Sequence, residues 1–145
     1  EKIGVPSRVM TAISINRVAE PYIKNKATKH LQKDRVVIFA SGTGNPFFST
    51  DTAAVLRASE MKSDIILKGT KVDGIYDKDP MTSNNAKKIA QISYAEYLSQ
   101  DIKVMDATAI SLAKDRGLPI IIFSIMNSSN IIDIIDGKGS YSIIK

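Results

Sequence analysis

Apolar runs and amphipathic segments alternate along the chain, with clusters of turn-forming residues between them. Runs rich in β-branched residues predict strands at residues 8–15, 36–40, 64–68, 118–123 and 141–144. The segments between them predict helices at residues 20–33, 51–61, 93–100, 107–116 and 130–135. Alternating strands and helices are typical of an α/β protein with a mainly parallel sheet. Because 145 residues are enough for one core, we expect residues 1–145 to form a single domain.

The apolar strand at residues 36–40, VVIFA, is followed by a glycine loop, SGTGNPFF, and then by a helix. Such a strand is expected to be buried on both faces of a parallel sheet. Ser49, Thr50 and Asp51 are each able to cap the helix. Backbone N–H groups at a loop of this kind, together with the positive end of a helix dipole, favour phosphate binding. The sequence matches neither a P-loop nor GxGxxG, so an ordinary tight turn with a core Phe47–Phe48 pair is the alternative.

Two later helices carry clear boundary signals. Ser93 and Glu96 have the spacing of a capping box, and Asp106 precedes the helix that Gly117 ends. Capping alone is a sufficient structural role for Asp106.

Residues 69–80, GTKVDGIYDKDP, leave the third predicted strand as a polar loop. The Asp73-Gly74 pair favours a turn, and Asp79-Pro80 stops any helix. The spacing of the acidic residues is not that of a calcium loop. Taken alone, Asp73, Asp77 and Asp79 fit a solvated turn. A second polar loop is expected at residues 81–88.

Composition excludes several classes of protein. A net charge of +5 without a basic stripe, and an aromatic content of 6%, argue against nucleic-acid binding. With no cysteine and one histidine, a typical zinc site is excluded and no metal ligands are assigned. No apolar run approaches the length of a membrane span, and the lack of cysteines and of a signal sequence favours the cytoplasm.

Three motifs resemble those of one family. GTGNPFFSTD is similar to the GTGNPFFTTD loop of bacterial UMP kinases (uridylate kinases) in the amino-acid kinase family. Residues 69–80 resemble the KxDGVYxxDP signature shared across that family. Residues 103–120, KVMDATAISLAKDRGLPI, resemble the corresponding UMP kinase segment, including Asp106. The chain is therefore identified as a member of this family, and the resemblance extends over essentially its whole length.

The resemblance covers only the C-terminal part of the family pattern. The KxSGE motif, the GGGN loop and the uridylate-contacting Asp of UMP kinases have no counterpart here. The resemblance implies an α/β/α sandwich with a mainly parallel central sheet whose N-terminal part is missing. We therefore expect a fragment of a longer protein, inactive or weakly active by itself, because the lysine that neutralises the transferred phosphate is absent.

The activity that the resemblance implies is ATP-dependent phosphorylation of UMP to UDP, in pyrimidine nucleotide biosynthesis. ATP would be held by Thr70, Tyr76 and Asp79. Asp51 and Asp106 are the candidate catalytic residues, orienting a lysine or Mg²⁺, which is inferred from the chemistry of ATP and not from a ligand motif. UMP would be held by the glycine loop, through Gly42, Thr43, Gly44, Asn45, Pro46, Phe47, Phe48, Ser49 and Thr50.

The resemblance also implies a homo-oligomer, a hexamer in the family's enzymes. Two alternatives stay open. One is another kinase of the family with aspartate, glutamate or carbamate as the acceptor. The other is a non-catalytic nucleotide-binding or storage module on the same fold.

Overall fold

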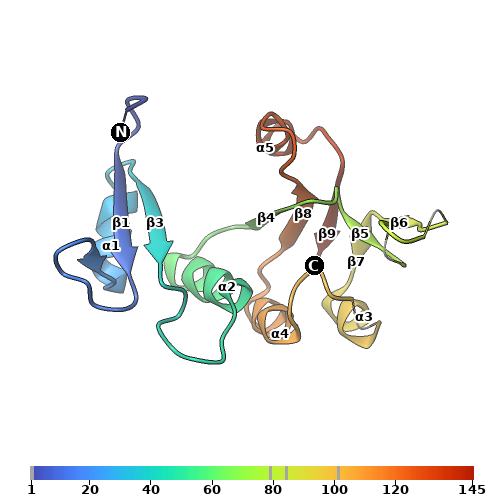
Figure 1. Cartoon of the computed structure of the whole chain (residues 1–145), viewed down its shortest axis with the longest axis horizontal. Helices are drawn as coiled ribbons and strands as arrows, with labels where there is room; N and C mark the ends of the chain where they lie inside the picture. Colours follow the sequence, from blue (N-terminus) through green and yellow to red (C-terminus); the bar gives the residue numbers. More distant parts are fainter. Residues whose placement is uncertain (1, 79, 84, 101) are drawn as a thin grey trace. The chain divides into compact units, whose positions relative to one another are not determined.

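The computed structural model describes residues 2–78, 80–83, 85–100 and 102–145 (Figure 1). The chain divides into two compact units, Glu1–Ser63 and Asp64–Lys145. Each unit has its own sheet and helices, and the two are described in turn. That both units form one domain stays a prediction.

The first unit is a small three-stranded parallel sheet with two helices. Its strand order is β2-β1-β3, and β1 pairs with both neighbours in parallel. Helix α1 packs against β3 and against α2. Met10, Ala27 and Val55 are fully buried and belong to its core. The elements are β1 (Ser7–Thr11), β2 (Glu20–Pro21), α1 (Lys24–Leu31), β3 (Val36–Ala40) and α2 (Thr50–Met61).

Three predictions for this unit were wrong in detail. The first strand ends at Thr11, whose hydroxyl donates to the carbonyl of Ile13 and turns the chain. The predicted helix at 20–33 begins only at Lys24, because Pro21 confines the preceding residue to extended conformations and residues 20–21 form β2. Strand β3 is not buried on both faces, since alternate side chains, at residues 36 and 38, are about half exposed.

The second unit contains a four-stranded sheet in the order β4-β8-β9-β7 and a separate two-stranded hairpin, β5-β6. Strand pairs β4-β8 and β7-β9 are parallel, whereas β8-β9 and β5-β6 are antiparallel. Helix α3 packs against α4. The elements are β4 (Ile66–Thr70), β5 (Ile75–Tyr76), β6 (Lys88–Ile89), β7 (Gln91–Ile92), α3 (Tyr94–Ser99), α4 (Ala107–Arg116), β8 (Ile120–Ser124), α5 (Asn130–Ile135) and β9 (Tyr141–Ile144).

Three helices, α2, α3 and α4, begin at the capping residues that the sequence predicted. Ser49 caps α2, Ser93 and Glu96 form the capping box of α3, and Asp106 caps α4. Gly117 ends α4 in the left-handed region, at φ 61°. The first unit combines helices with parallel strand pairs, and the second combines them with two parallel and two antiparallel pairs. The predicted α/β class is confirmed. Within the described part of the chain, helices are too short or too polar to cross a membrane.

Candidate nucleotide-binding sites

The glycine loop follows β3 at an edge of the first sheet where two parallel strands end together. Thr11 at the end of β1 is paired with Ala40 at the end of β3. The Thr11 and Ser41 hydroxyls are hydrogen-bonded at 2.9 Å, and Gly44 N–H donates to the Ser41 carbonyl at 3.0 Å. In parallel α/β sheets, loops at the carboxyl ends of strands are the usual place for ligands.

Gly44 is required by the packing of this loop. Its φ is +78°, and a Cβ atom there would lie 3.0 Å from the carbonyl oxygen of Ala12 and 3.1 Å from its Cβ. Only glycine permits both the left-handed backbone and this close approach to the segment after β1. The loop is therefore held against its neighbour by backbone contact.

Two residues that are not glycine also adopt positive φ in the loop, Ser41 at 65° and Phe47 at 68°. Such conformations cost about 1 kcal/mol or more each and are concentrated at functional sites. The Phe47 side chain is fully exposed, and that of Phe48 is 54% exposed. The alternative of an ordinary turn with a core Phe47–Phe48 pair was therefore wrong, and two aromatic rings face outward on a strained loop.

The loop ends at the N-terminus of α2, which has twelve residues. Ser49 is the N-cap, its Oγ accepting a hydrogen bond from Thr52 N–H at 3.1 Å. Asp51 lies in the first turn, where the helix dipole favours a carboxylate. Within the loop, Asn45 N–H donates to Thr43 Oγ1 at 3.1 Å, which fixes the local turn. The first unit thus brings residues 42–51 together as one continuous loop and helix start.

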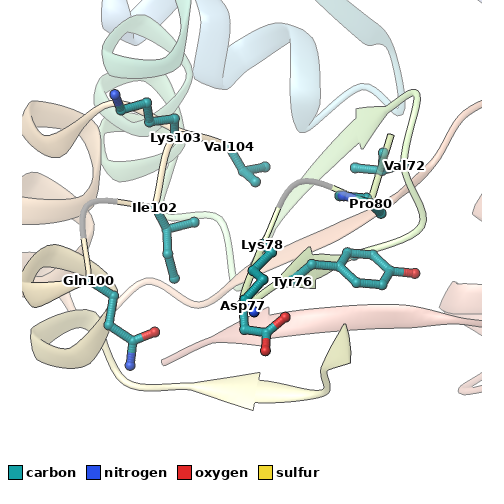
Figure 2. Close-up of a pocket in the computed structure, with 10 residues that line it drawn as sticks. Val72, Tyr76, Asp77, Lys78, Pro80, Gln100, Ile102, Lys103 and Val104 are labelled. Atoms are coloured by element: carbon teal, nitrogen blue, oxygen red, sulfur yellow. The ribbon is translucent and has the colours of Figure 1, made fainter. Parts of the chain in front are cut away.

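The second unit contains a pocket of about 420 Å³ (Figure 2). One wall comes from the segment that includes β5, and the other from the connection between α3 and α4. The pocket combines apolar walls with two lysines, a chemistry suited to a nucleotide's base and phosphates. It is lined by Val72, Gly74, Tyr76, Asp77, Lys78, Pro80, Gln100, Ile102, Lys103 and Val104.

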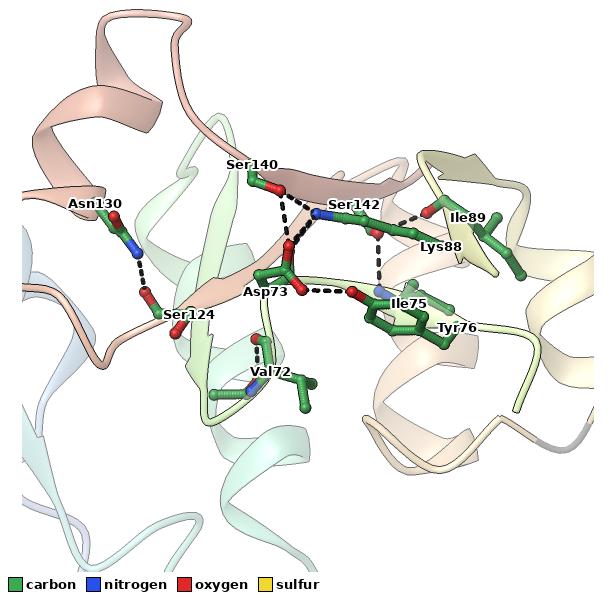
Figure 3. A network of polar contacts seen from close by, with 11 residues as sticks. Val72, Asp73, Ile75, Tyr76, Lys88, Ile89, Ser124, Asn130, Ser140 and Ser142 are labelled. Atoms are coloured by element: carbon green, nitrogen blue, oxygen red, sulfur yellow. Dashed lines mark hydrogen bonds and ion pairs between the residues drawn. The ribbon is translucent and has the colours of Figure 1, made fainter. Parts of the chain in front are cut away.

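Tyr76, which was predicted to contact ATP, lines this pocket. Its hydroxyl is hydrogen-bonded to a residue that does not line the pocket (Figure 3). Its hydroxyl donates to Asp73 Oδ1 at 2.7 Å. Lys88 Nζ donates to Asp73 Oδ2 at 2.8 Å and to its carbonyl at 2.8 Å. The Ser140 hydroxyl donates to Oδ2 at 2.8 Å and also contacts Lys88. Asp73 is therefore no simple solvated turn residue but the centre of a network.

Charge and hydrogen bonds determine the protonation state of this network. Burial alone would raise the pKa of Asp73, but hydrogen bonds from Lys88, Tyr76 and Ser140 outweigh it and hold that pKa well below its usual range. The hydrogen bond to Asp73 in turn raises the pKa of Tyr76. Asp73 is an anion and Tyr76 a neutral phenol near neutral pH.

Gly74 and Ser142 place β5 next to this network. Ser142 is fully buried; its Oγ accepts from Ile75 N–H at 2.8 Å and donates to the Ile89 carbonyl at 2.6 Å. A Cβ on Gly74 would lie 2.5 Å from that Oγ. The β5-β6 hairpin is thereby held against β9.

The other predicted residues of the second unit occupy different positions. Thr70 does not line the pocket; its hydroxyl donates to the Val72 carbonyl at 2.7 Å and accepts from Val72 N–H at 3.0 Å, which shapes the wall. Asp79 lies outside the described residues. Asp106 Oδ1 accepts from Ala109 N–H at 2.9 Å as the cap of α4, just beyond the wall residue Val104. Roles for Asp51 and Asp106 in catalysis stay predictions.

Sequence reasoning missed the second wall, made by Gln100, Ile102, Lys103 and Val104. No local signal distinguishes these residues, because the pocket forms only when the α3-α4 connection packs beside the segment after β4. The sequence KVMD at residues 103–106 resembles the family segment and contains the cap of α4, but neither feature indicates a pocket wall.

No group of three or more residues able to hold a metal ion occurs among the described residues. Mg²⁺ in phosphotransferases is usually bound by one or two carboxylates together with the nucleotide's phosphates, so isolated carboxylates are compatible with it.

The sequence model of the amino acid kinase family matches residues 1–124. The chain belongs to this family. The family membership that was predicted from the three sequence motifs is therefore confirmed.

Uridylate kinases are among the family members that this chain is similar to. It is 50% identical over 143 residues to one from Neorickettsia sennetsu, covering 99% of this chain and 61% of that protein. It is 55% identical over 144 residues to one from Wolbachia pipientis wMel, covering 99% and 58%. The chain therefore spans about 60% of the length of the curated relatives it matches.

Solved structures agree with this family assignment. UMP kinase from Ureaplasma parvum has a TM-score of 0.95 at 36% identity, covering 99% of this chain and 62% of that one. UMP kinase from Bacillus anthracis has a TM-score of 0.93 at 39% identity, covering 97% and 58%. The amino-acid kinase fold is confirmed for a chain that matches part of those structures.

Proposed function

We propose that this chain provides the acceptor loop and the ATP pocket of a UMP kinase, which transfers the γ-phosphoryl group of ATP to UMP and releases UDP. The observation that carries the proposal is the strained loop at residues 41–50 with its outward-facing Phe47 and Phe48. The names of the similar proteins from Neorickettsia and Wolbachia support UMP as the acceptor.

In this proposal, each part of the glycine loop has a role in UMP binding. The rings of Phe47 and Phe48 offer apolar faces to the uracil ring. Thr43 and Asn45 present polar atoms for its carbonyl and N–H groups. The start of α2, with Ser49 and Thr50, offers N–H groups and a positive dipole end to the phosphate.

ATP is proposed to occupy the pocket of the second unit. Tyr76, Val72 and Val104 are proposed to contact the base, and Lys78 and Lys103 to contact the phosphates. Thr70 would act by shaping the loop, and Asp79 is proposed as a further ATP contact from the family motif.

Phosphoryl transfer requires alignment and charge neutralisation more than covalent chemistry. UMP is already an anion at neutral pH, so Asp51 and Asp106 are proposed as orienting groups for a lysine or for Mg²⁺ and not as general bases. Mg²⁺ bound with ATP would supply further neutralisation of the phosphate oxygens. We also propose a cytoplasmic, hexameric enzyme of pyrimidine nucleotide biosynthesis as the setting of the whole protein.

Acceptor choice tests the proposal. Calorimetric titration of the chain should show tighter binding of UMP than of CMP, AMP or aspartate. If aspartate binds most tightly, the chain belongs to another kinase of the family. If UMP, CMP, AMP and aspartate bind equally, the UMP assignment is refuted. An ADP-release assay with ATP, Mg²⁺ and UMP distinguishes an enzyme from a binding module. We expect little or no turnover from these 145 residues alone and robust turnover from a chain extended to the length of its relatives.

A further inference from the structure

One wall of the pocket lies in the connection between α3 and α4. Its described residues, 100 and 102–106, belong to no helix or strand. Figure 2 shows Ile102 and Val104 on this connection, among the side chains that line the pocket. Backbone N–H and C=O groups in an irregular segment lack the regular partners of a helix or sheet and need other donors and acceptors. The position of this wall therefore depends on the side chains that hold its backbone.

Tyr97 holds the residue that follows the wall. Its hydroxyl accepts a hydrogen bond from Met105 N–H at 2.7 Å and donates one to the Met105 carbonyl at 3.1 Å. A phenol hydroxyl can donate one hydrogen bond and also accept one, so the single Tyr97 hydroxyl bonds both backbone groups of Met105. Tyr97 is 1% exposed and Met105 3%, which keeps bulk water from replacing these bonds. The hydroxyl thus links the middle of α3 to the end of the connection.

Neighbouring contacts extend this restraint in both directions. Lys68 Nζ, from β4, donates to the Val104 carbonyl at 2.7 Å. Asp106 follows Met105 directly and caps α4 through Ala109 N–H. A displacement of Met105 would therefore move the pocket residue Val104 on one side and the candidate catalytic residue Asp106 on the other.

We propose that Tyr97 is a positioning residue for ATP binding, which fixes the Val104 side of the pocket and the start of α4 without touching the nucleotide. This inference rests on the proposed assignment of the pocket to ATP. Removing the hydroxyl leaves the buried N–H and C=O of Met105 without this partner, so the connection shifts to regain hydrogen bonds. A tyrosine with a packing role alone would affect unfolding and leave ATP affinity unchanged.

The test compares Tyr97→Phe with Tyr94→Phe, which removes the same atom from a partly buried residue of the same helix. ATP and UMP are titrated separately into the 145-residue chain by calorimetry, and exchange of the Met105 amide is followed by NMR. Tyr97→Phe should raise the Kd for ATP roughly three- to ten-fold, speed exchange at Met105 and leave the Kd for UMP unchanged. Tyr94→Phe should change none of the three.

Other outcomes overturn the inference in distinguishable ways. An unchanged Kd for ATP, with a lower Tm, assigns Tyr97 to packing alone. An equal loss of ATP and UMP affinity indicates general destabilisation. If the unaltered chain binds no ATP, both the assignment of the pocket to ATP and the role of Tyr97 fail. If the unaltered chain binds ATP and the variant binds it equally, only this inference fails.

Discussion

The hydroxyl of Tyr76 donates a 2.7 Å hydrogen bond to the carboxylate of Asp73, three residues earlier in the chain. The same carboxylate accepts from Lys88 and Ser140, which belong to β6 and to the segment before β9 (Figure 3). The carboxylate that holds this pocket residue is therefore itself bonded by two segments that lie far from it in the sequence. Both testable properties of this network, its effect on ATP binding and its dependence on pH, follow from the charge of Asp73.

Asp73→Asn should weaken ATP binding and leave UMP binding unchanged. The amide keeps the shape of the side chain but loses the charge that orders Lys88 and the Tyr76 hydroxyl. We expect the Kd for ATP to rise roughly three- to ten-fold, measured by calorimetry. Asp115→Asn, an exposed change on α4, is the matched control. Equal ATP affinity in Asp73→Asn and the unaltered chain would show that Tyr76 needs no such support.

The lowered pKa of Asp73 predicts an acid-sensitive contribution to stability. Because its pKa is depressed in the folded state, the contribution is complete above the unfolded value of about 4 and is lost as pH falls below it. Urea unfolding between pH 5 and pH 2.5 should show the unaltered chain losing stability more steeply below about pH 4 than Asp73→Asn. Lys88→Met should flatten the same part of the curve. Parallel curves for all three chains would contradict the prediction.

Tyr22 should make the stability of the first unit depend on pH in the alkaline range, in the opposite direction to Asp73. Burial, followed by its hydrogen bond to Glu60, raises the pKa of Tyr22 to about 12, although the Arg57 guanidinium stacked 3.8 Å from the ring centre opposes this. Because the neutral phenol is favoured in the folded state, its contribution is complete below about pH 10 and is lost as pH rises towards 12.

Ultraviolet titration of the tyrosines measures this shift. The difference between the unaltered chain and Tyr22→Phe should show one phenol with a midpoint near pH 12. Glu60→Gln should move that midpoint towards 10, because it removes the negative charge beside the hydroxyl. A difference curve already centred near 10 in the unaltered chain would contradict the partly buried Tyr22–Glu60 contact.

The two loop glycines should respond differently to alanine. In Gly42→Ala the only penalty is the positive φ of +59°, because the nearest atom to the new Cβ is Ala53 Cβ at 4.0 Å. This substitution should lower the unfolding free energy by about 1 kcal/mol. Gly44→Ala carries the same backbone penalty and also approaches the Ala12 carbonyl at 3.0 Å. Urea unfolding should therefore rank Gly44→Ala as clearly the more destabilising. Equal losses would mean that the loop is not pressed against Ala12.

Local capping signals in the sequence predicted the ends of α3 and α4 accurately, and non-local pairing explains errors in the strands. Ser93, Glu96 and Gly117 act within one helical turn, so their roles were readable from spacing alone. Strand β2 exists only because residues 20–21 pair with β1, and β5 only because it pairs with β6, which begins twelve residues after β5 ends. The glycine loop and Tyr76 were found through motifs, whereas the Tyr97–Met105 contact joins residues that carry no common motif.

Phe47 allows stability and ligand binding to be separated. Its ring is fully exposed, so Phe47→Ser removes no core contact and should change the unfolding free energy by less than about 0.5 kcal/mol. If the ring contacts uracil, the Kd for UMP should rise roughly three- to ten-fold, since aromatic contacts contribute about 0.5–1.5 kcal/mol beyond burial. Val18→Ser removes another exposed apolar side chain of the same unit and should affect neither quantity. Both variants are measured by calorimetry with UMP and by urea unfolding. If Phe47→Ser loses stability but keeps its affinity for UMP, Phe47 has a structural role. The main support for the loop as the acceptor site would then be lost.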